Sequence, residues 1–391
     1  MNIDPKNLDS WRNAVIYHIF IDRFAGLTHH RNRMKPKFCG GNLRGIIEKL
    51  PYIKDLGINA ILLSPFYKGV AYHGYHITDF YKIDKRFGTE RDLQELITKA
   101  HAAGIRVLID FVPNHMSSKH PFFIEARTNR KSQYREWFFF KPNNDYMKFL
   151  TFKELAKINL DHPTAMEHIR GAAAKWLKFG VDGMRIDHVI GLSNQNLSDL
   201  TRPLRAEFPK AIFFGETVIN RHHNLKEIST LRFPHKYWIC LLRRFSIKAN
   251  ELIAKNYAGL LDGILDFVQE DDLFKYAKRR HSNEKIVQKQ SSILGNQILQ
   301  FSFLDNHDNE RFLFKVKNNK QKLLRGVEAL FDITQPKIIY YGTEIGMTQK
   351  CKFSKRRKYP DLLARQPMIW DEKKQDQELL ARFKEIIAKN R

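Results

Sequence analysis

The chain is poor in cysteine, in long apolar stretches and, relative to its basic residues, in acidic ones. Its three cysteines, Cys39, Cys240 and Cys351, are odd in number and widely spaced, which supports neither a disulfide framework nor a zinc site. No window offers the roughly 18 apolar residues needed to span a bilayer. The polar start, residues 1–7, lacks the apolar core of a secretion signal. We therefore expect a cytoplasmic protein.

The shortage of acidic residues leaves a net charge of +25 over 391 residues. Basic residues gather at 127–135, 315–325 and 352–358. Such clusters could bind a nucleic acid or an anionic surface, but no RNA- or DNA-binding motif accompanies them. We interpret them as a solvated, lysine-rich surface and expect neither nucleic acid nor a membrane as a partner.

Short runs of β-branched and aromatic residues recur along the chain, and most are followed by helical patterns. Residues 93–100, for example, repeat apolar side chains at the i, i+3, i+4, i+7 spacing of one helix face, and Gly104 follows as a stop. Strands that alternate with helices predict a parallel sheet, and eight such units predict an α/β fold, the (β/α)8 TIM barrel. The predicted strands are Ala14–Ile21, Ala60–Leu63, Arg106–Phe111, Gly183–Asp187, Ala211–Gly215, Gly263–Phe267, Leu299–Leu304 and Lys337–Tyr341.

The interval between the third and fourth predicted strands is too long for a simple connection, at about seventy residues. A helical pattern at 165–179 accounts only for its last part, and the remainder is rich in aromatic and polar residues. We expect residues 116–160 to form a short inserted subdomain, with 1–115 and 161–391 forming the barrel.

The ends of the predicted strands carry the chemistry, since barrel enzymes build their sites at the carboxyl ends of strands. Arg185 and Asp187 are two residues apart on one strand and should point the same way. A guanidinium beside a carboxylate favours the ionised form, as a nucleophile requires. Glu216 ends the next strand, where partial burial and a like charge favour its protonated form. Two such carboxyl groups can lie roughly 5 Å apart, as in retaining glycosidases.

These strand ends resemble the sequence regions of the α-amylase family, glycoside hydrolase family 13. The short segment Leu155–Leu160 also resembles the motif that closes the inserted subdomain of that family, called domain B. The resemblance runs from about residue 14 to 391, and the combination of segments is specific to the family. The segments that resemble its four regions, in order, are Asp110–His115, Gly183–Asp187, Phe214–Glu216 and Phe303–Asp308.

The resemblance implies a role for each matching residue. Asp187 matches the nucleophile, Glu216 the general acid/base, and Asp308 the carboxylate that binds and distorts the sugar. Asp361 and Arg365 fit a pair that holds the next glucose on the non-reducing side, although a surface salt bridge would explain them equally well. The implied substrate-binding residues are Tyr75, His115, Arg185, His307, Asp361 and Arg365.

Some positions depart from the family pattern. Ile190 and Gly191 stand where many members have Lys-His, a pair that binds the leaving-group sugar and whose histidine backbone helps to bind calcium. Asn114 matches a calcium ligand, but domain B shows no convincing acidic ligands, so we expect no required metal, with calcium near Asn114 as the alternative. His188 is a candidate to replace the lost sugar contacts. The family usually carries a C-terminal β-sandwich, but residues 381–389 are typical of the eighth barrel helix, so we expect no sandwich in this chain, either because that domain is naturally absent or because the chain is truncated.

We therefore expect a retaining glycoside hydrolase that cleaves α-glucosidic bonds, α-1,4 bonds first of all, in starch-like glucans or maltooligosaccharides. A maltodextrin glucosidase or a 4-α-glucanotransferase is the alternative within the family, because water and a sugar hydroxyl can both accept the glycosyl group. A non-catalytic carbohydrate-binding or scaffold barrel is a distant alternative, disfavoured because all three carboxylates are present. The oligomeric state is left open.

Overall fold

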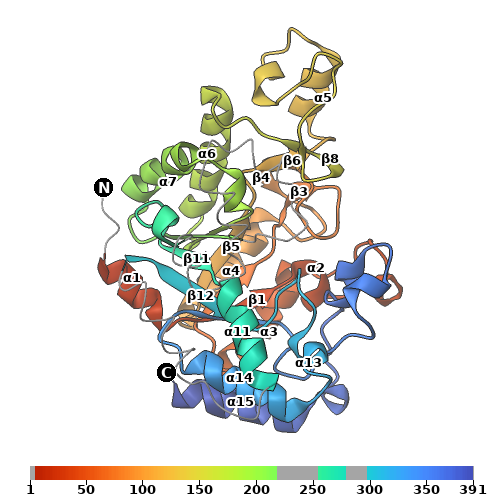
Figure 1. The fold of residues 1–391 in the computed structure, drawn as a ribbon, viewed down its shortest axis with the longest axis vertical. Coiled ribbons are helices and arrows are strands. Elements are labelled where there is room, and N and C mark those ends of the chain that lie inside the picture. Colours follow the sequence, from red (N-terminus) through yellow and green to blue (C-terminus); the bar gives the residue numbers. More distant parts are fainter. Residues whose placement is uncertain (1–4, 218–253, 279–296, 391) are drawn as a thin grey trace.

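A closed barrel of eight parallel strands organises the molecule. The computed structural model describes residues 5–217, 254–278 and 297–390, and the strands follow one another around the barrel in the order β1-β13-β12-β11-β10-β9-β5-β2 (Figure 1). Each predicted strand overlaps one barrel strand with ends within two residues, which confirms the (β/α)8 prediction. The strands are β1 (Val15–Ile19), β2 (Ala60–Leu63), β5 (Arg106–Phe111), β9 (Gly183–Ile186), β10 (Ile212–Gly215), β11 (Gly263–Leu265), β12 (Leu299–Phe303) and β13 (Lys337–Tyr340).

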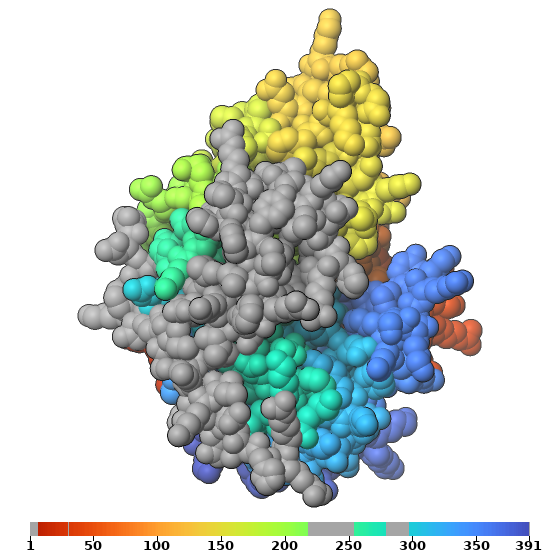
Figure 2. Space-filling model, viewed as in Figure 1, coloured from red at the N-terminus to blue at the C-terminus, as the bar shows by residue number. Residues whose placement is uncertain are grey.

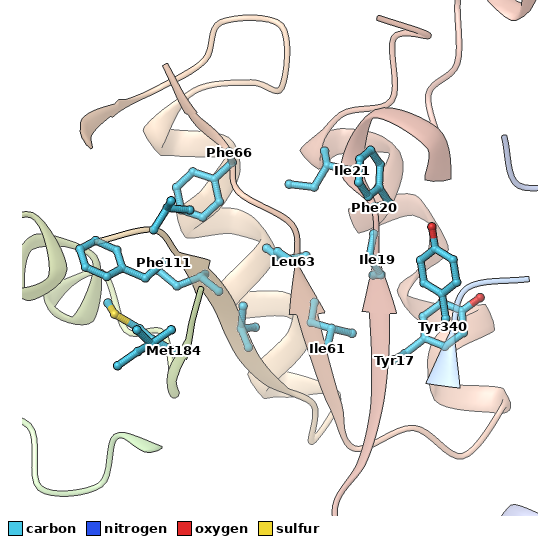
Figure 3. Close-up of a cluster of buried hydrophobic side chains, with 14 of the residues drawn as sticks. Tyr17, Ile19, Phe20, Ile21, Ile61, Leu63, Phe66, Phe111, Met184 and Tyr340 are labelled. Carbon is cyan, nitrogen blue, oxygen red and sulfur yellow. The ribbon is translucent and has the colours of Figure 1, made fainter. Parts of the chain in front are cut away.

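The alternation of side chains along each strand divides the core into two layers. On β1, Ile16 packs inside the barrel, whereas Tyr17 belongs to the layer between the strands and the helices. Phe214 and Phe301 stack face to face in the inner layer, with ring centroids 4.0 Å apart. Figure 3 shows part of the outer layer, with Ile61 and Leu63 among its labelled side chains.

Helices surround the barrel and bury one apolar face each. In α4, Thr89 and Asp92 form a capping box at the start, and the 93–100 apolar face is buried. No helix among the described residues is long and apolar enough to cross a membrane. The helices are α1 (Pro5–Arg12), α2 (Ile21–Phe24), α3 (Leu43–Asp55), α4 (Glu90–Ala102), α5 (Pro121–Thr128), α6 (Pro163–Lys178), α7 (Asn194–Glu207), α11 (Phe267–Lys278), α13 (Phe312–Lys315), α14 (Lys320–Phe331) and α15 (Gln377–Lys389).

Between β5 and α6 the chain leaves the barrel and builds a small antiparallel sheet. Its strands lie in the order β6-β8-β7, with bounds β6 (His115–Ser117), β7 (Lys148–Phe149) and β8 (Phe152–Lys157). Together with α5, this part forms the yellow lobe that projects from one end of the molecule (Figures 1 and 2). The lobe corresponds to the expected domain B, whose boundaries at 116 and 160 stay a prediction. A second antiparallel pair, β3 (Tyr67–Gly69) and β4 (Ile77–Ile83), lies between β2 and α4.

Candidate active site

Strand periodicity decides which side chains reach the inside of the barrel at its carboxyl end. Residues two apart on a strand share a face, and Leu108 on β5 lies in the inner core, so Asp110 continues inward. In the same way Phe214 on β10 leads to Glu216, which follows the strand directly. Arg185 on β9 leads to Asp187. Three neighbouring strands, β5, β9 and β10, therefore deliver charged groups to one place.

Arg185 lies at the centre of this cluster. One terminal nitrogen of its guanidinium donates to both carboxylate oxygens of Asp110, at 2.6 Å each, and to Asp187 Oδ1 at 2.9 Å. The other terminal nitrogen lies 3.0 Å from Glu216 Oε2. The same Glu216 oxygen accepts the backbone N–H of His188 at 3.0 Å. The shared guanidinium thus holds the carboxyl groups of Asp187 and Glu216 side by side.

A single guanidinium facing three carboxyl groups cannot neutralise them all. Burial raises the pKa of Asp187, and the nearby charges of Glu216 and Asp110 add to this, against the opposing charge of Arg185. Burial also raises the pKa of Asp110. Arg185 acts as expected in favouring the ionised form of Asp187, but burial acts against it. Carboxyl groups that interact this closely titrate as a unit rather than one by one.

A second cluster surrounds Asp308, beyond the end of β12. Arg365 donates to Asp308 Oδ1 at 2.7 Å and forms an ion pair with Asp361 Oδ2, also at 2.7 Å. His307 Nε2 lies 2.9 Å from Asp308 Oδ2. Although burial acts in the opposite direction, His307 and Arg365 hold the pKa of Asp308 well below its usual range. The predicted pair Asp361 and Arg365 therefore lies at the site, because Arg365 contacts Asp308 directly.

Tyr75 connects the two clusters. Its hydroxyl donates to Asp110 Oδ2 at 2.7 Å and lies 2.8 Å from His307 Nε2. Its ring lies nearly parallel to that of His307, with centroids 5.6 Å apart and 13° between the planes. The structure thus brings Tyr75 to the expected place, while its stacking on a sugar stays a prediction.

His115, at the start of β6, lies in the same region but is covered by domain B. Its ring is buried and stacks on Phe149 of β7, with centroids 4.2 Å apart and 21° between the planes. Burial lowers the pKa of His115 to about 3, and the neighbouring His76 and Lys157 act in the same direction. The ring is therefore neutral at ordinary pH. Its predicted hydrogen bond to a sugar is not tested by this arrangement.

The segment after Asp187 lies against an aromatic side chain of domain B. His188 takes a left-handed conformation, with φ 44° and ψ 49°, and Ile190 is buried. The rings of Phe149 and His188 lie nearly perpendicular to each other, with centroids 4.7 Å apart. Phe152 of β8 lies roughly parallel to Phe149 and is 49% exposed. Phe149 of domain B thus contacts the residue that follows Asp187, and Phe152 lies beside Phe149.

Sequence reasoning missed several members of this constellation. Asp110 was quoted as part of a strand end but received no role, although the two-residue periodicity places it inward. Tyr72, whose hydroxyl donates to Asp361 Oδ2 at 2.9 Å, carries no sequence signal beyond its nearness to Tyr75. Phe149 and Lys157 belong to domain B, and no local sequence pattern predicts how the strands of that subdomain pair.

The residues around Asn114 do not fit a calcium ion. Lys157 Nζ donates to Asn114 Oδ1 at 2.5 Å and to the backbone oxygen of Gly191 at 2.7 Å. These are the two oxygens that the family pattern would offer to the metal, and here a lysine ammonium uses both. Calcium prefers six to eight oxygen ligands. No group of three or more histidine, cysteine or acidic side chains suited to a metal occurs in the described part of the chain.

The fold and the carboxyl–guanidinium cluster define a TIM-barrel protein with its site at the carboxyl ends of the strands. The sequence model of the alpha-amylase catalytic domain matches residues 18–385. Alpha-amylase 2 of Dictyoglomus thermophilum is 36% identical over 400 residues, covering 99% of this chain and 65% of the relative. The intracellular maltogenic amylase of Bacillus subtilis is 26% identical, covering 98% of this chain and 63% of the relative.

Solved structures agree on the fold. The cyclic alpha-maltosyl-(1→6)-maltose hydrolase of Arthrobacter globiformis superposes with a TM-score of 0.77 at 22% identity, covering 97% of this chain and 83% of that one. The chain belongs to the α-amylase family, as the sequence resemblance predicts. It spans 65% and 63% of the two relatives described above.

Proposed function

We propose that this protein is a retaining glycoside hydrolase that cleaves α-1,4-glucosidic bonds in starch-like glucans or maltooligosaccharides. The observation that carries the proposal is the single guanidinium of Arg185, which holds Asp187 and Glu216 from neighbouring strands side by side. Retaining enzymes need two carboxyl groups close enough for one to attack while the other donates a proton.

The reaction proceeds by two displacements at the anomeric carbon. Glu216 protonates the glycosidic oxygen while an Asp187 oxygen attacks the anomeric carbon, so the bond to the leaving sugar breaks as the bond to Asp187 forms. The now ionised Glu216 then removes a proton from water, which attacks the same carbon and releases Asp187. Asp308, held ionised by Arg365, stabilises the positive charge that develops on the sugar. A sugar hydroxyl in place of water gives transfer, the alternative reaction.

The two sides of the reacting sugar are bound by different means in this proposal. Asp361 and Arg365 hold the sugar on the non-reducing side. On the leaving-group side, Ile190 and Gly191 offer no side-chain hydrogen bonds. We propose that Phe152, an exposed ring next to the site, contacts the sugar there by its face. The names of the relatives, among them an alpha-amylase and a cyclomaltodextrinase, support an α-glucan substrate.

Product analysis on starch, maltotriose, pullulan, cyclomaltodextrin and trehalose tests the proposal. An endo-hydrolase gives mixed maltooligosaccharides from starch, a glucosidase gives glucose, and a transferase gives products longer than maltotriose from maltotriose. Absence of turnover on every glucan, with a folded protein, would favour the non-catalytic barrel.

The stereochemistry of the product is a separate test. Proton NMR of freshly released sugar should show the α-anomer first, because two inversions restore the original configuration. An initial β-anomer would show that water attacks directly and that Asp187 is not a nucleophile.

We also propose a cytoplasmic protein whose basic clusters are a solvated surface rather than a nucleic-acid site. Lys131, Lys317 and Lys358 are exposed members of these clusters, and one relative is named an intracellular enzyme. A gel shift with a salt titration checks this, because phosphate binding would weaken steeply as salt rises.

A further inference from the structure

Lys157 joins three segments that meet where domain B leaves the barrel. It is the last residue of β8, and it pairs with His115 on β6. Its ammonium donates to Asn114 Oδ1, just beyond β5, and to the backbone oxygen of Gly191, in the segment that follows Asp187. The backbone N–H of Ile158 donates to the Asn114 carbonyl oxygen at 3.0 Å and strengthens the same junction.

Gly191 is closely packed against other members of the junction. A Cβ on Gly191 would lie 2.3 Å from Asn114 Oδ1 and 2.7 Å from His188 Cδ2. A side chain there would therefore require the Asn114 amide or the His188 ring to move from the position it has here. The sequence departure at Gly191 and the ammonium of Lys157 therefore belong to one arrangement.

The junction is also connected to the catalytic carboxyl groups through the segment from His188 to Gly191. The segment from His188 to Gly191 is tied at its start to Glu216, because the His188 N–H donates to the Glu216 carboxylate and the Val189 N–H donates to the Glu216 carbonyl oxygen at 3.1 Å. At its other end Lys157 binds the Gly191 carbonyl oxygen. Asp187 directly precedes this segment, so a cation at Gly191 fixes the backbone next to the nucleophile.

We propose that the Lys157 ammonium is a built-in cation that takes the structural place of calcium, joining domain B to the barrel and positioning the segment 188–191 beside Asp187. A side-chain cation satisfies the same two oxygens that a metal would bind, without dependence on a free ion. Lys157 is thus a positioning residue, since no described contact joins its ammonium to Asp187 or Glu216 themselves.

The experiment compares the wild type with Lys157→Met, Lys157→Asp and a matched control, Lys153→Met, which changes an exposed lysine on the same strand. For each protein we would measure the Tm in EDTA and in millimolar calcium chloride, together with kcat and KM. The Tm comparison does not depend on the proposed reaction, so a wrong substrate assignment would not be mistaken for failure of this inference.

The wild type and Lys153→Met should show the same Tm in EDTA and in calcium. Lys157→Met should lower the Tm by about 2–5 °C in both, since two oxygens lose their donor, and should lower kcat by roughly tenfold while changing KM less. Lys157→Asp supplies a carboxylate to a place with two oxygens already present. Its Tm and kcat should be low in EDTA and should rise in calcium, a response that Lys157→Met should lack.

Three results would overturn the inference. The first is a large fall in the wild-type Tm on adding EDTA, which would mean that the protein needs a metal despite Lys157. The second is a Lys157→Met protein indistinguishable from Lys153→Met. The third is a Lys157→Asp protein that does not respond to calcium, which would show that the ammonium and a metal ion are not equivalent here. If Lys157→Met fails to fold, the wild-type and Lys157→Asp measurements still decide.

Discussion

Two arginines at the carboxyl end of the barrel, Arg185 and Arg365, each contact more than one carboxyl group, but the pKa of one carboxyl group beside Arg185 shifts in the opposite direction to that of one beside Arg365. Arg185 contacts three carboxyl groups, including Asp187, whereas Arg365 contacts two, including Asp308. The pKa of Asp187 is raised by burial, and that of Asp308 is held below its usual range by His307 and Arg365. The side chain of Asp187 is 9% exposed and that of Asp308 is 43% exposed.

The difference shows that the pairing of a carboxylate with an arginine does not by itself decide the proton state. The number of carboxyl groups that share the guanidinium contributes, and so does a second basic neighbour such as His307 beside Asp308. In the cluster around Arg185, burial raises the pKa of both Asp187 and Asp110. In the cluster around Arg365, the lowered pKa of Asp308 favours its ionised form, as charge stabilisation needs.

The largest expected effect comes from removing the carboxyl groups themselves. Glu216→Gln, Asp187→Asn and Asp308→Asn should each lower kcat by roughly a thousandfold or more, since each removes a proton donor, a nucleophile or a stabilising charge. Steady-state kinetics on maltoheptaose, with circular dichroism to verify folding, provides the measurement. Glu167→Gln, on the exposed face of α6, is the control. A folded Asp187→Asn protein with near wild-type turnover would rule out the mechanism.

A change at Asp110 would sharpen the comparison through the pH profile. Asp187 must be ionised to attack, and its pKa is raised, so kcat/KM should fall as the pH drops through a value above the ordinary aspartate range of about 3.9. Asp110→Asn removes a like charge and should move this acid limb to lower pH by up to about one unit. Asp361→Asn, in the other cluster, should leave the limb in place. An acid limb that moves to higher pH in Asp110→Asn would contradict this account.

Substitution of Arg365 should change KM more than substitution of Ile190, in the segment after Asp187. Arg365→Ala removes the partner of both Asp308 and Asp361 and should raise KM by roughly tenfold, as expected for a lost charge-assisted contact. Ile190→Lys should lower KM by less, because Ile190 is buried and a lysine there must first reach the sugar. Kinetics of both variants and a cleavage map of end-labelled maltoheptaose check this. Cuts mostly near the non-reducing end, with several glucoses required on the leaving side, would mean that the subsites are assigned wrongly.

The smallest expected effect concerns the exposed ring of domain B. Phe152→Ala should raise KM several-fold and leave kcat nearly unchanged, since the ring would contribute uniform binding rather than transition-state stabilisation. Ile124→Ala, another exposed apolar side chain of domain B, serves as the control. Equal kinetics for the two variants would remove Phe152 from the substrate site.

Local sequence patterns were sufficient to predict the barrel strands and the positions of the three carboxylates. Short runs of β-branched and aromatic residues located all eight barrel strands, because a strand buried on both faces needs an apolar run whatever lies beside it. The positions of Asp187, Glu216 and Asp308 followed from the same pattern, since the carboxyl ends of parallel strands meet at one end of a barrel. The α-amylase family resemblance rested on those same residues and is confirmed by the comparisons.

The proton state of the site and the junction at Lys157 were decided only by the tertiary structure. The pKa of Asp187 depends on Asp110 and Glu216, which lie on the strands on either side of its own, and on burial that no local pattern reports. Lys157 meets Asn114 and Gly191 across separations of 43 and 34 residues. Periodicity describes a side chain relative to its own helix or strand. Contacts between distant segments also depend on register, on loop path and on close approaches such as that at Gly191, which exist only when the whole chain has folded.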